Sequence, residues 1–298
     1  MKTVLRFLPI ILLFLVAACV PSSQNNEEIP APTATQVAAL PTAEPGLTLQ
    51  QLQNMSYLSP NFGTPVQLKE GVYNEDSMAV SLLPQIAIGD LNGDQINDAA
   101  VLLAENGGGT GTFVSLVVIV SQDGEFRQVG SAMIDDRPVI ESLKIDDGDI
   151  LLNAVVHGIN DAMVSPTLGV KQTYKLLENY LFMVKQSSTP QGGTERSIII
   201  DSPLDGSKVS GSVQLKGSMP IAPFENNLRF RVLDLAGTPL LTDGFMVTSA
   251  DVGMPAVFDN QITLPTLPSG AWVRLELAEL SMADGSMMDM NSVLVKIK

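Results

Sequence analysis

The stretch Leu228-Arg229-Phe230-Arg231-Val232 decides the class of fold, because apolar and charged residues alternate along it without a break. A β-strand turns successive side chains to opposite faces of a sheet, so this alternation predicts a strand with one buried and one solvated face. The same pattern recurs in Val273-Arg274-Leu275-Glu276-Leu277. Both stretches therefore predict a β-sheet that covers a core with one of its faces.

Further strands are predicted on either side of these two stretches. Turn residues separate short apolar runs at the spacing that is typical of a β-sandwich. The predicted strands cover residues 198–200, 213–215, 228–233, 240–247, 257–264, 273–280 and 293–297. We expect a β-sandwich over residues 197–298.

The same region resembles the bacterial spore germination immunoglobulin-like domain. The resemblance rests on Ile200-Asp201-Ser202-Pro203, Gly206, Val209, Gly217, Phe224-Glu225-Asn226, Arg231-Val232-Leu233-Asp234, Gly237, Glu279-Leu280-Ser281 and Asp284-Gly285-Ser286. It implies an immunoglobulin-like β-sandwich of a kind found in exported or lipid-anchored proteins, without a catalytic role. It implies no link to sporulation.

Residues 47–186 are predicted to form a separate β-rich domain that begins with a short helix. Thr48 is a suitable N-cap for that helix. The predicted strands cover 85–88, 99–104, 113–121, 139–145 and 150–156, and a last strand or hairpin covers 174–184. Asp-Gly pairs at 123–124 and 147–148 predict tight hairpin turns. The region resembles an uncharacterised domain of bacterial lipoproteins, which implies no activity, and residues 187–196 are the expected linker to the sandwich.

The N-terminal residues are predicted to be an export signal that ends at Cys19, the only cysteine of the sequence. Lys2 and Arg6 precede an apolar run over 7–16. This run is too short for a membrane-spanning helix, which needs about 20 apolar residues, but it suits the apolar part of a signal peptide. The segment Val16-Ala17-Ala18-Cys19 resembles the lipobox of bacterial lipoproteins. This implies removal of the signal peptide 1–18 and attachment of fatty acids such as palmitate to Cys19, on the extracytoplasmic side of the cell membrane. The alternative is ordinary secretion, which leaves the thiol free.

Residues 19–46 hold five prolines among small and polar residues. Such a composition buries too little apolar surface to order the chain, so it predicts a disordered tether. The sequence carries a net charge of −15. An acidic surface repels phosphate backbones, which argues against a nucleic acid as partner. The single cysteine leaves no intramolecular disulfide, so apolar burial has to stabilise the fold.

Residues 90–98, Asp-Leu-Asn-Gly-Asp-Gln-Ile-Asn-Asp, have the spacing of a calcium-binding loop. The predicted ligands are the side chains of Asp90, Asn92, Asp94 and Asp98 and the carbonyl of Ile96. Two departures weaken the match: Gln95 replaces the usual glycine, and Val101 replaces the bidentate glutamate of helix-type loops. The alternative is a hairpin closed by Asn92-Gly93, with Asx turns at Asp94 and Asp98.

For three further motifs, a structural role is a better explanation than a catalytic or ligand-binding role. The glycine-rich stretch 105–112 precedes β-branched residues and no lysine, so it predicts a hairpin loop rather than a phosphate site. His157 is the only histidine, and no serine stands in the sequence context of a catalytic triad. The methionines at 282, 287, 288 and 290 lack a histidine or cysteine nearby for copper, so we expect them to pack on the end of the sandwich.

Two classes of function are compatible with these features. The leading prediction is a non-catalytic cell-surface lipoprotein whose β-domains bind a protein or an envelope polymer, or take part in envelope assembly. The alternative is a calcium-assisted envelope hydrolase that uses loop carboxylates such as Asp94, Asp98 and Asp161 for acid–base work. We expect no enzymatic activity and no cofactor besides calcium.

Overall fold

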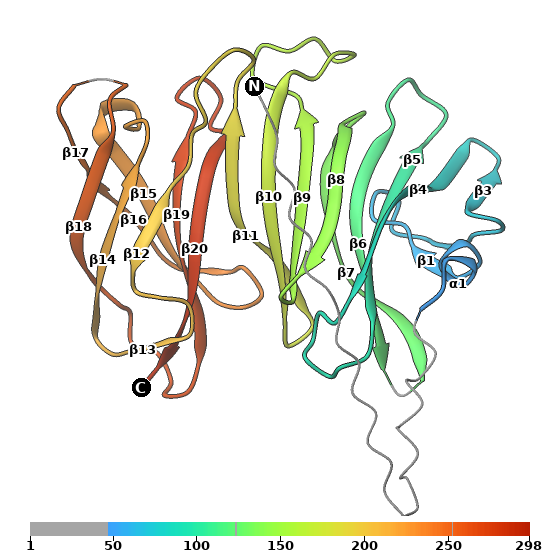
Figure 1. Cartoon of the computed structure of the whole chain (residues 1–298), viewed down its shortest axis with the longest axis horizontal. Coiled ribbons are helices and arrows are strands. Elements are labelled where there is room, and N and C mark those ends of the chain that lie inside the picture. Colours follow the sequence, from blue (N-terminus) through green and yellow to red (C-terminus); the bar gives the residue numbers. More distant parts are fainter. Residues whose placement is uncertain (1–46, 123, 252) are drawn as a thin grey trace, which may run out of the picture. The chain divides into compact units, whose positions relative to one another are not determined.

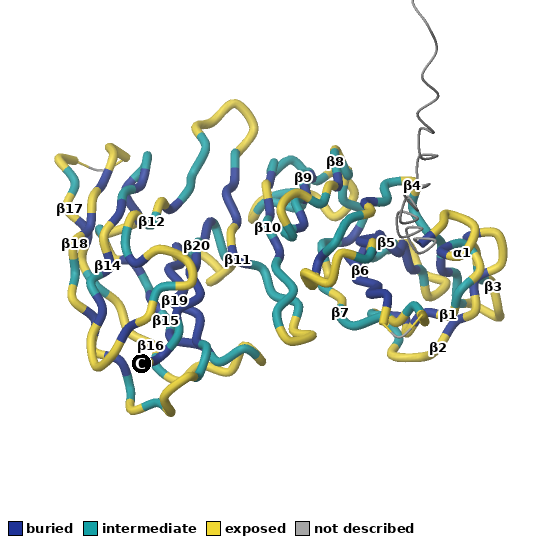
Figure 2. Tube along the Cα trace, turned by 60° about the horizontal axis from the view of Figure 1, so that its bottom comes forward, coloured by how far each residue is buried: buried dark blue, intermediate teal, exposed yellow. Residues whose placement is uncertain are grey.

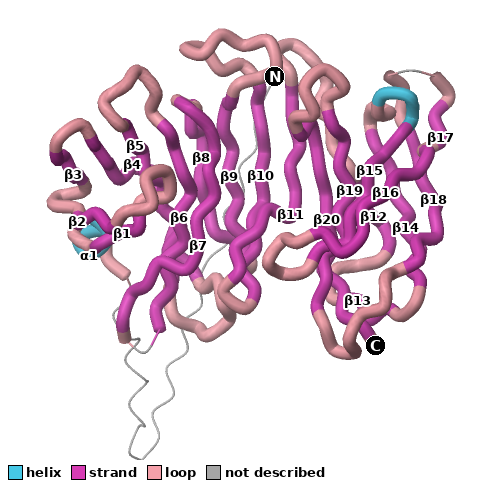
Figure 3. The backbone as a smooth tube through the Cα atoms, turned by 180° about the vertical axis from the view of Figure 1, so that it is seen from behind, coloured by secondary structure: helices cyan, strands magenta, loops and turns pink. Residues whose placement is uncertain are grey.

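Antiparallel β-strands make up most of the chain that the structure describes (Figures 1 and 3). This computed structural model describes residues 47–122, 124–251 and 253–298. The signal peptide 1–18, Cys19 and the tether 19–46 lie outside the described residues. The predicted mainly β fold class is confirmed. Within the described ranges, no helix has both the length and the apolar sequence to cross a membrane.

The first part of the described chain begins with the predicted helix, α1. Thr48 caps α1: its hydroxyl accepts the Gln51 backbone N–H at 3.3 Å, and the Gln51 side chain accepts the Thr48 backbone N–H at 2.8 Å. The elements of this part are α1 (Leu49–Gln53), β1 (Ser56–Leu58), β2 (Pro65–Gln67), β3 (Val72–Glu75), β4 (Met78–Gly89), β5 (Asp98–Asn106), β6 (Phe113–Gln122), β7 (Glu125–Asp136), β8 (Val139–Asp146), β9 (Asp149–Val156), β10 (Leu168–Leu177) and β11 (Tyr180–Thr189).

Strands β5 and β6 are central in the sheet β3-β4-β5-β6-β7 and are buried on both faces. On β5, Ala100 and Leu102 share a core with residues of β8, β9 and β10, whereas Val101 and Leu103 share a core with α1, β1 and β2. Two-sided burial explains the nearly continuous apolar sequence of these strands. Figure 2 shows both strands in the dark blue of buried residues.

The second part of the described chain forms a sandwich of two sheets. Its elements are β12 (Ile199–Ser202), β13 (Ser207–Val209), β14 (Ser212–Met219), the 3-10 turn η1 (Phe224–Asn226), β15 (Asn227–Leu233), β16 (Pro239–Met246), β17 (Thr248–Ser249), β18 (Ala256–Thr263), β19 (Trp272–Leu280) and β20 (Met287–Ile297). The sheet β12-β14-β18-β17 lies on one side of the core, and β16, β15, β19 and β20 lie on the other.

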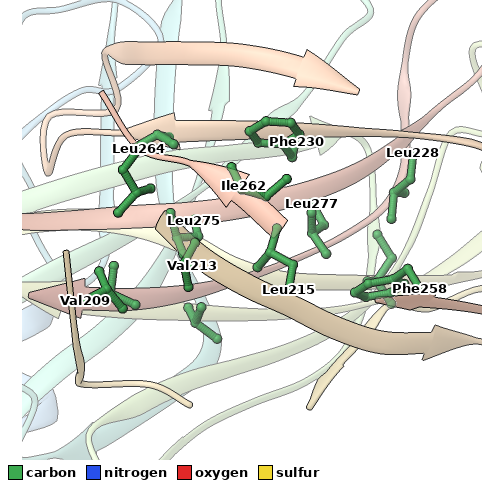
Figure 4. Close-up of a cluster of buried hydrophobic side chains, with 14 of the residues drawn as sticks. Val209, Val213, Leu215, Leu228, Phe230, Phe258, Ile262, Leu264, Leu275 and Leu277 are labelled. Carbon is green, nitrogen blue, oxygen red and sulfur yellow. The ribbon is translucent and has the colours of Figure 1, made fainter. Parts of the chain in front are cut away.

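Side chains from both sheets meet in the core of the sandwich (Figure 4). Leu228, Phe230 and Val232 are buried there, so the predicted buried face of β15 is confirmed. Gly217 allows a close approach between β14 and β12, because a Cβ at this position would lie 1.9 Å from the carbonyl oxygen of Ile199.

The two parts share one sheet, with the strand order β16-β15-β19-β20-β11-β10-β9-β8. β11 pairs with β20 through Lys185–Asn291 and Gln186–Met290. Residues 187–189, which we assigned to the linker, belong to β11, and Ser188 exchanges two backbone hydrogen bonds of 3.1 and 2.8 Å with Arg196. The described residues form one compact unit. The division into domains 47–186 and 197–298 therefore stays a prediction.

The solvated face predicted for residues 273–277 is wrong. On β19, Arg274 and Glu276 are only 8% and 2% exposed. The Arg274 guanidinium donates to the carbonyl of Met183 and lies 5.1 Å from the centre of the Phe182 ring. Residues of β11 therefore cover this face, which the sequence of β19 alone does not reveal.

Candidate functional site

The predicted calcium loop is folded by its own carboxylates. Asp90 accepts backbone N–H groups from Gly93 at 2.7 Å and Gln95 at 2.8 Å, and Asp94 accepts that of Ile96 at 2.8 Å. Desolvation raises the pKa of Asp90, but the backbone hydrogen bonds outweigh it and hold the pKa below its usual value. Gln95 has a φ of 69°, in the left-handed region that calcium loops usually reserve for glycine.

Asp98 is held by backbone groups of both the loop and the sheet. It is fully buried, and its two oxygens accept the backbone N–H groups of Leu91 and Ser121, each at 2.9 Å. Burial raises the pKa of Asp98. Asp98 pairs with Gly89, so the loop over 90–97 is longer than a turn closed by Asn92-Gly93.

Few side chains of this loop lie close enough together to bind one metal ion. Across the described parts of the chain, no three His, Cys, Asp or Glu side chains gather into a group that could hold a metal ion. Asn92 and Asp94 do lie together, since the Asn92 amide donates to Asp94 at 3.0 Å. Calcium binding by Asp90, Asn92, Asp94, Asp98 and the Ile96 carbonyl stays a prediction, although both oxygens of Asp98 already accept backbone N–H groups.

The glycine-rich loop and the histidine lie at the opposite end of β5. Residues 107–112 connect the antiparallel strands β5 and β6, as expected for a hairpin loop, and the Thr112 N–H donates to Asp136 at 2.7 Å. His157 Nδ1 lies 2.8 Å from an Asp135 carboxylate oxygen. Desolvation lowers the pKa of His157, but the hydrogen bond and charge of Asp135 outweigh it and raise the pKa.

Of the carboxylates considered for acid–base work, Asp161 lies far from Asp98, whereas Asp94 is close enough to Asp98 for its charge to contribute to the raised pKa of Asp98. Asp161 lies beside this histidine and accepts the backbone N–H of Gly158 at 2.7 Å. Asp98 begins β5, and Asp135 pairs through Val114 with Ala104 near its other end. The length of strand between Asp98 and Ala104 is about 20 Å at ~3.3 Å per residue.

An apolar groove crosses one end of the C-terminal sandwich. Residues 221–226 form one side, residues 279–283 form the other, and Ile159 of the β9–β10 loop contributes to the lining. The groove has a volume of about 550 Å³. Phe224 and Met282 are 59% and 71% exposed in it. Large apolar side chains that gather in a concave surface are typical of interaction sites.

A buried charged cluster forms the base of the groove. Arg196 Nε donates to Glu279 at 3.1 Å, and a second nitrogen of the same guanidinium donates to the other carboxylate oxygen. Asp289 faces Glu279 across β19 and β20 and is fully buried. Burial, followed by the charge of Glu279, raises the pKa of Asp289 to about 8, although Arg196 opposes the shift. When protonated, Asp289 is the hydrogen-bond donor toward Glu279.

The methionines of residues 282–290 take different positions. Met282 and Met288 line the groove, whereas Met290 is buried. Residues 287–290 belong to β20 rather than to a loop. Met288 lies at the end of the sandwich as expected, whereas the buried Met290 pairs with Gln186 of β11.

Residues 197–286 match the immunoglobulin-like domain of bacterial spore germination. The resemblance that we described for the C-terminal third is confirmed over these residues, and so is the immunoglobulin-like sandwich. No curated protein matches the chain. The groove belongs largely to this immunoglobulin-like domain, because the segments Phe224-Glu225-Asn226 and Glu279-Leu280-Ser281, which carried the resemblance, form its two sides.

Sequence reasoning missed the groove and its charged base. In the sequence, Phe224 and Met282 are apolar residues in polar loops. They line a groove only because the two loops face each other in the fold, which the sequence does not show. Glu279 continues the strand of Val273 and Leu275 at a position where an apolar residue is expected. That break in the alternation is the signal that could have pointed to a buried charge.

Proposed function

We propose that this protein is a non-catalytic binding protein, attached to the extracytoplasmic side of the cell membrane by a lipid on Cys19. The immunoglobulin-like domain makes it a β-domain protein for which catalysis is not expected. The lipobox resemblance supports the anchor. The proline-rich composition of 19–46 supports a tether that holds the folded part on the order of 30–80 Å from the membrane.

The groove of the immunoglobulin-like domain is the proposed binding surface. Its support is the exposure of Phe224 and Met282 in a concave site of about 550 Å³. Burial of such side chains by a ligand gains about 25 cal/mol per Å² of apolar surface. The ligand class is a protein, a peptide or an envelope polymer, and the acidic net charge of −15 argues against a nucleic acid.

A binding role is favoured over hydrolysis by the placement of the carboxylates. Asp98 begins β5, whereas Asp161 lies in the β9–β10 loop near the other end of β5, so these two carboxylates are too far apart to act on one bond. Both oxygens of Asp98 already accept backbone N–H groups. His157 is engaged by Asp135 rather than by a nucleophile.

Site-specific photo-crosslinking tests this proposal. A photoreactive residue at position 224 of the membrane-anchored chain should capture an envelope component, and Met282→Asp should reduce that capture at least tenfold. The control position is Leu204, which is 69% exposed between β12 and β13, outside the groove. Equal capture from positions 204 and 224, or capture that Met282→Asp leaves unchanged, would contradict the proposal.

A further inference from the structure

Three arginines converge on one buried glutamate at the outer face of β15 and β19. Arg231 donates to Glu276 Oε1 from two nitrogens, at 2.8 and 2.6 Å. Arg229 approaches the same oxygen only to 3.7 Å, and Arg274 lies 3.7 Å from the other oxygen. Glu276 is 2% exposed, so its single charge is enclosed by three guanidinium groups.

Arg229 is the least satisfied member of this cluster. Its Nε is buried and has no hydrogen-bond partner within the part of the chain that the structure describes. Desolvation lowers the pKa of Arg229, and the charge of Arg231 lowers it further, while Glu276 partly opposes both. Three positive charges face one negative charge here, although the whole chain carries a net charge of −15. The cluster therefore favours an added anionic group beside Arg229.

A hollow of about 290 Å³ gives that group access to Arg229. Gly244 and Ala278 also line it, and their small size leaves room above the sheet. The exposed side chains of Phe224 and Met282 line this hollow and the apolar groove alike, so the two sites adjoin. The arginine end is thus continuous with a surface suited to apolar groups.

The acidic residues around the hollow determine whether it favours an anion with one negative charge or with two. Glu225, Asp243 and Glu279 also line the hollow, and within the described ranges Glu279 is the one of these three that forms an ion pair, with Arg196. The two exposed carboxylates disfavour a dianion such as phosphate. A single carboxylate carries one charge and matches the planar fork of one guanidinium through two parallel hydrogen bonds.

We propose that the Arg229 hollow binds the terminal carboxylate of a peptide whose last side chain is apolar. The carboxylate lies against Arg229, and the apolar side chain lies against Phe224 and Met282. This inference rests on the proposed binding function of the groove and names the chemistry of its ligand.

Isothermal titration calorimetry on the full chain in detergent tests the proposal with three probes. We expect N-acetyl-leucine to bind saturably, N-acetyl-leucinamide to bind at least tenfold more weakly, and inorganic phosphate to bind more weakly than N-acetyl-leucine. Arg229→Gln should reduce the affinity for N-acetyl-leucine at least tenfold. The matched control is Arg127→Gln on β7, an exposed arginine that is paired with Glu125 and should leave the affinity unchanged.

Arg229→Lys separates loss of the guanidinium fork from loss of folding. It keeps the charge, so the chain should melt as the unmodified protein does while binding N-acetyl-leucine at least fivefold more weakly. Equal affinity for N-acetyl-leucine and its amide, tighter binding of phosphate, or full affinity in Arg229→Gln would overturn the carboxylate proposal. Capture from position 224 that persists in Arg229→Gln would leave the groove as a binding surface and remove only this inference.

Discussion

Asp289 and Glu279 face each other between β19 and β20, with one arginine, Arg196, to balance them. Neither oxygen of Asp289 finds a hydrogen-bond donor among the described groups. An ionised Asp289 would leave two negative charges beside one positive charge in the interior. The carboxyl group is therefore held in its neutral form, and its proton is part of the folded structure.

We predict that this proton makes the stability fall as the pH rises. In the folded chain, Asp289 keeps its proton up to about pH 8, whereas in the unfolded chain it loses the proton near pH ~4. The folded state binds more protons between these values, so its free energy of unfolding decreases from pH 5 to pH 8, by up to about 4 kcal/mol. Asp289→Asn should flatten this dependence and be more stable than the unmodified chain at pH 8. Denaturant unfolding at both pH values measures the effect.

The control for this prediction is Asp284→Asn. Asp284 is exposed in the β19–β20 loop, and its backbone hydrogen bond with Ser286 lowers its pKa, so it is ionised at both pH 5 and pH 8. Its substitution should leave the slope with pH unchanged. An Asp289→Asn chain with the slope of the unmodified protein would show that Asp289 is ionised in the folded state.

Single residues could be predicted from the sequence where near neighbours decide their role. Thr48 caps a helix because Gln51 stands three residues later. The partners of Arg229 and Asp289 are on other strands, so no local pattern indicates their environment. The two arginines of the opening stretch were expected in solvent, yet Arg231 holds a buried glutamate.

At the scale of elements, the strands with regular patterns were predicted and the irregular ones were not. The turn over Asp147-Gly148 joins β8 and β9 as its Asp-Gly pair predicts. β7 was missed because much of it is exposed and polar, so its sequence resembles a loop. The short strands β1, β2 and β3 were missed because three or four residues are too few to show a period.

Gly217→Ala should weaken the pairing of β14 with β12. The added Cβ would lie 1.9 Å from the Ile199 carbonyl oxygen and 2.4 Å from a ring carbon of Phe258, so the strands have to move apart. We expect a loss of about 3 kcal/mol in the free energy of unfolding, measured by denaturant titration. Gly109→Ala is the control, because an added Cβ there meets no atom within 4 Å. Similar losses in both variants would argue against a close approach at Gly217.

The Asp90 loop gives a prediction about calcium. A weak site with a dissociation constant of about 1 mM would stabilise the chain by about 1.4 kcal/mol in 10 mM calcium. Asp94→Asn should abolish this gain and change the melting temperature little without calcium. Calorimetry of both chains with and without calcium makes the comparison. An unchanged melting temperature of the unmodified chain would leave the loop as a series of Asx turns without a metal.

At the scale of the whole molecule, the sequence indicated two β-rich stretches but not how they are joined. The expected linker has the composition of a loop, and composition does not show that residues 187–189 extend β11. It also does not show that β11 joins β20 or covers the outer face of β19. These are contacts between segments about 100 residues apart in the chain, which only the folded structure brings together.

The membrane anchor gives a prediction that concerns the whole chain. Cys19→Ala removes the only thiol, so the protein should move from the membrane fraction to the soluble fraction of the extracytoplasmic compartment. Cell fractionation followed by immunoblotting measures the shift. Intact mass determination of the unmodified protein is the companion measurement. A free thiol at Cys19, or an unchanged distribution of the variant, would exclude lipid attachment at this residue.

The junction between β11 and β20 determines how the protein would carry mechanical load. If a ligand in the groove pulls against the lipid anchor, tension passes from the start of the first part, at residue 47, into the immunoglobulin-like domain. The turn over 190–195 transmits this tension through the covalent chain. The pairing of β11 with β20 transmits it by a second route, through hydrogen bonds. The hydrogen bonds of Ser292 to Val184 and of Arg274 to Met183 reinforce that second route. The turn is thereby shielded from stretching until these bonds rupture.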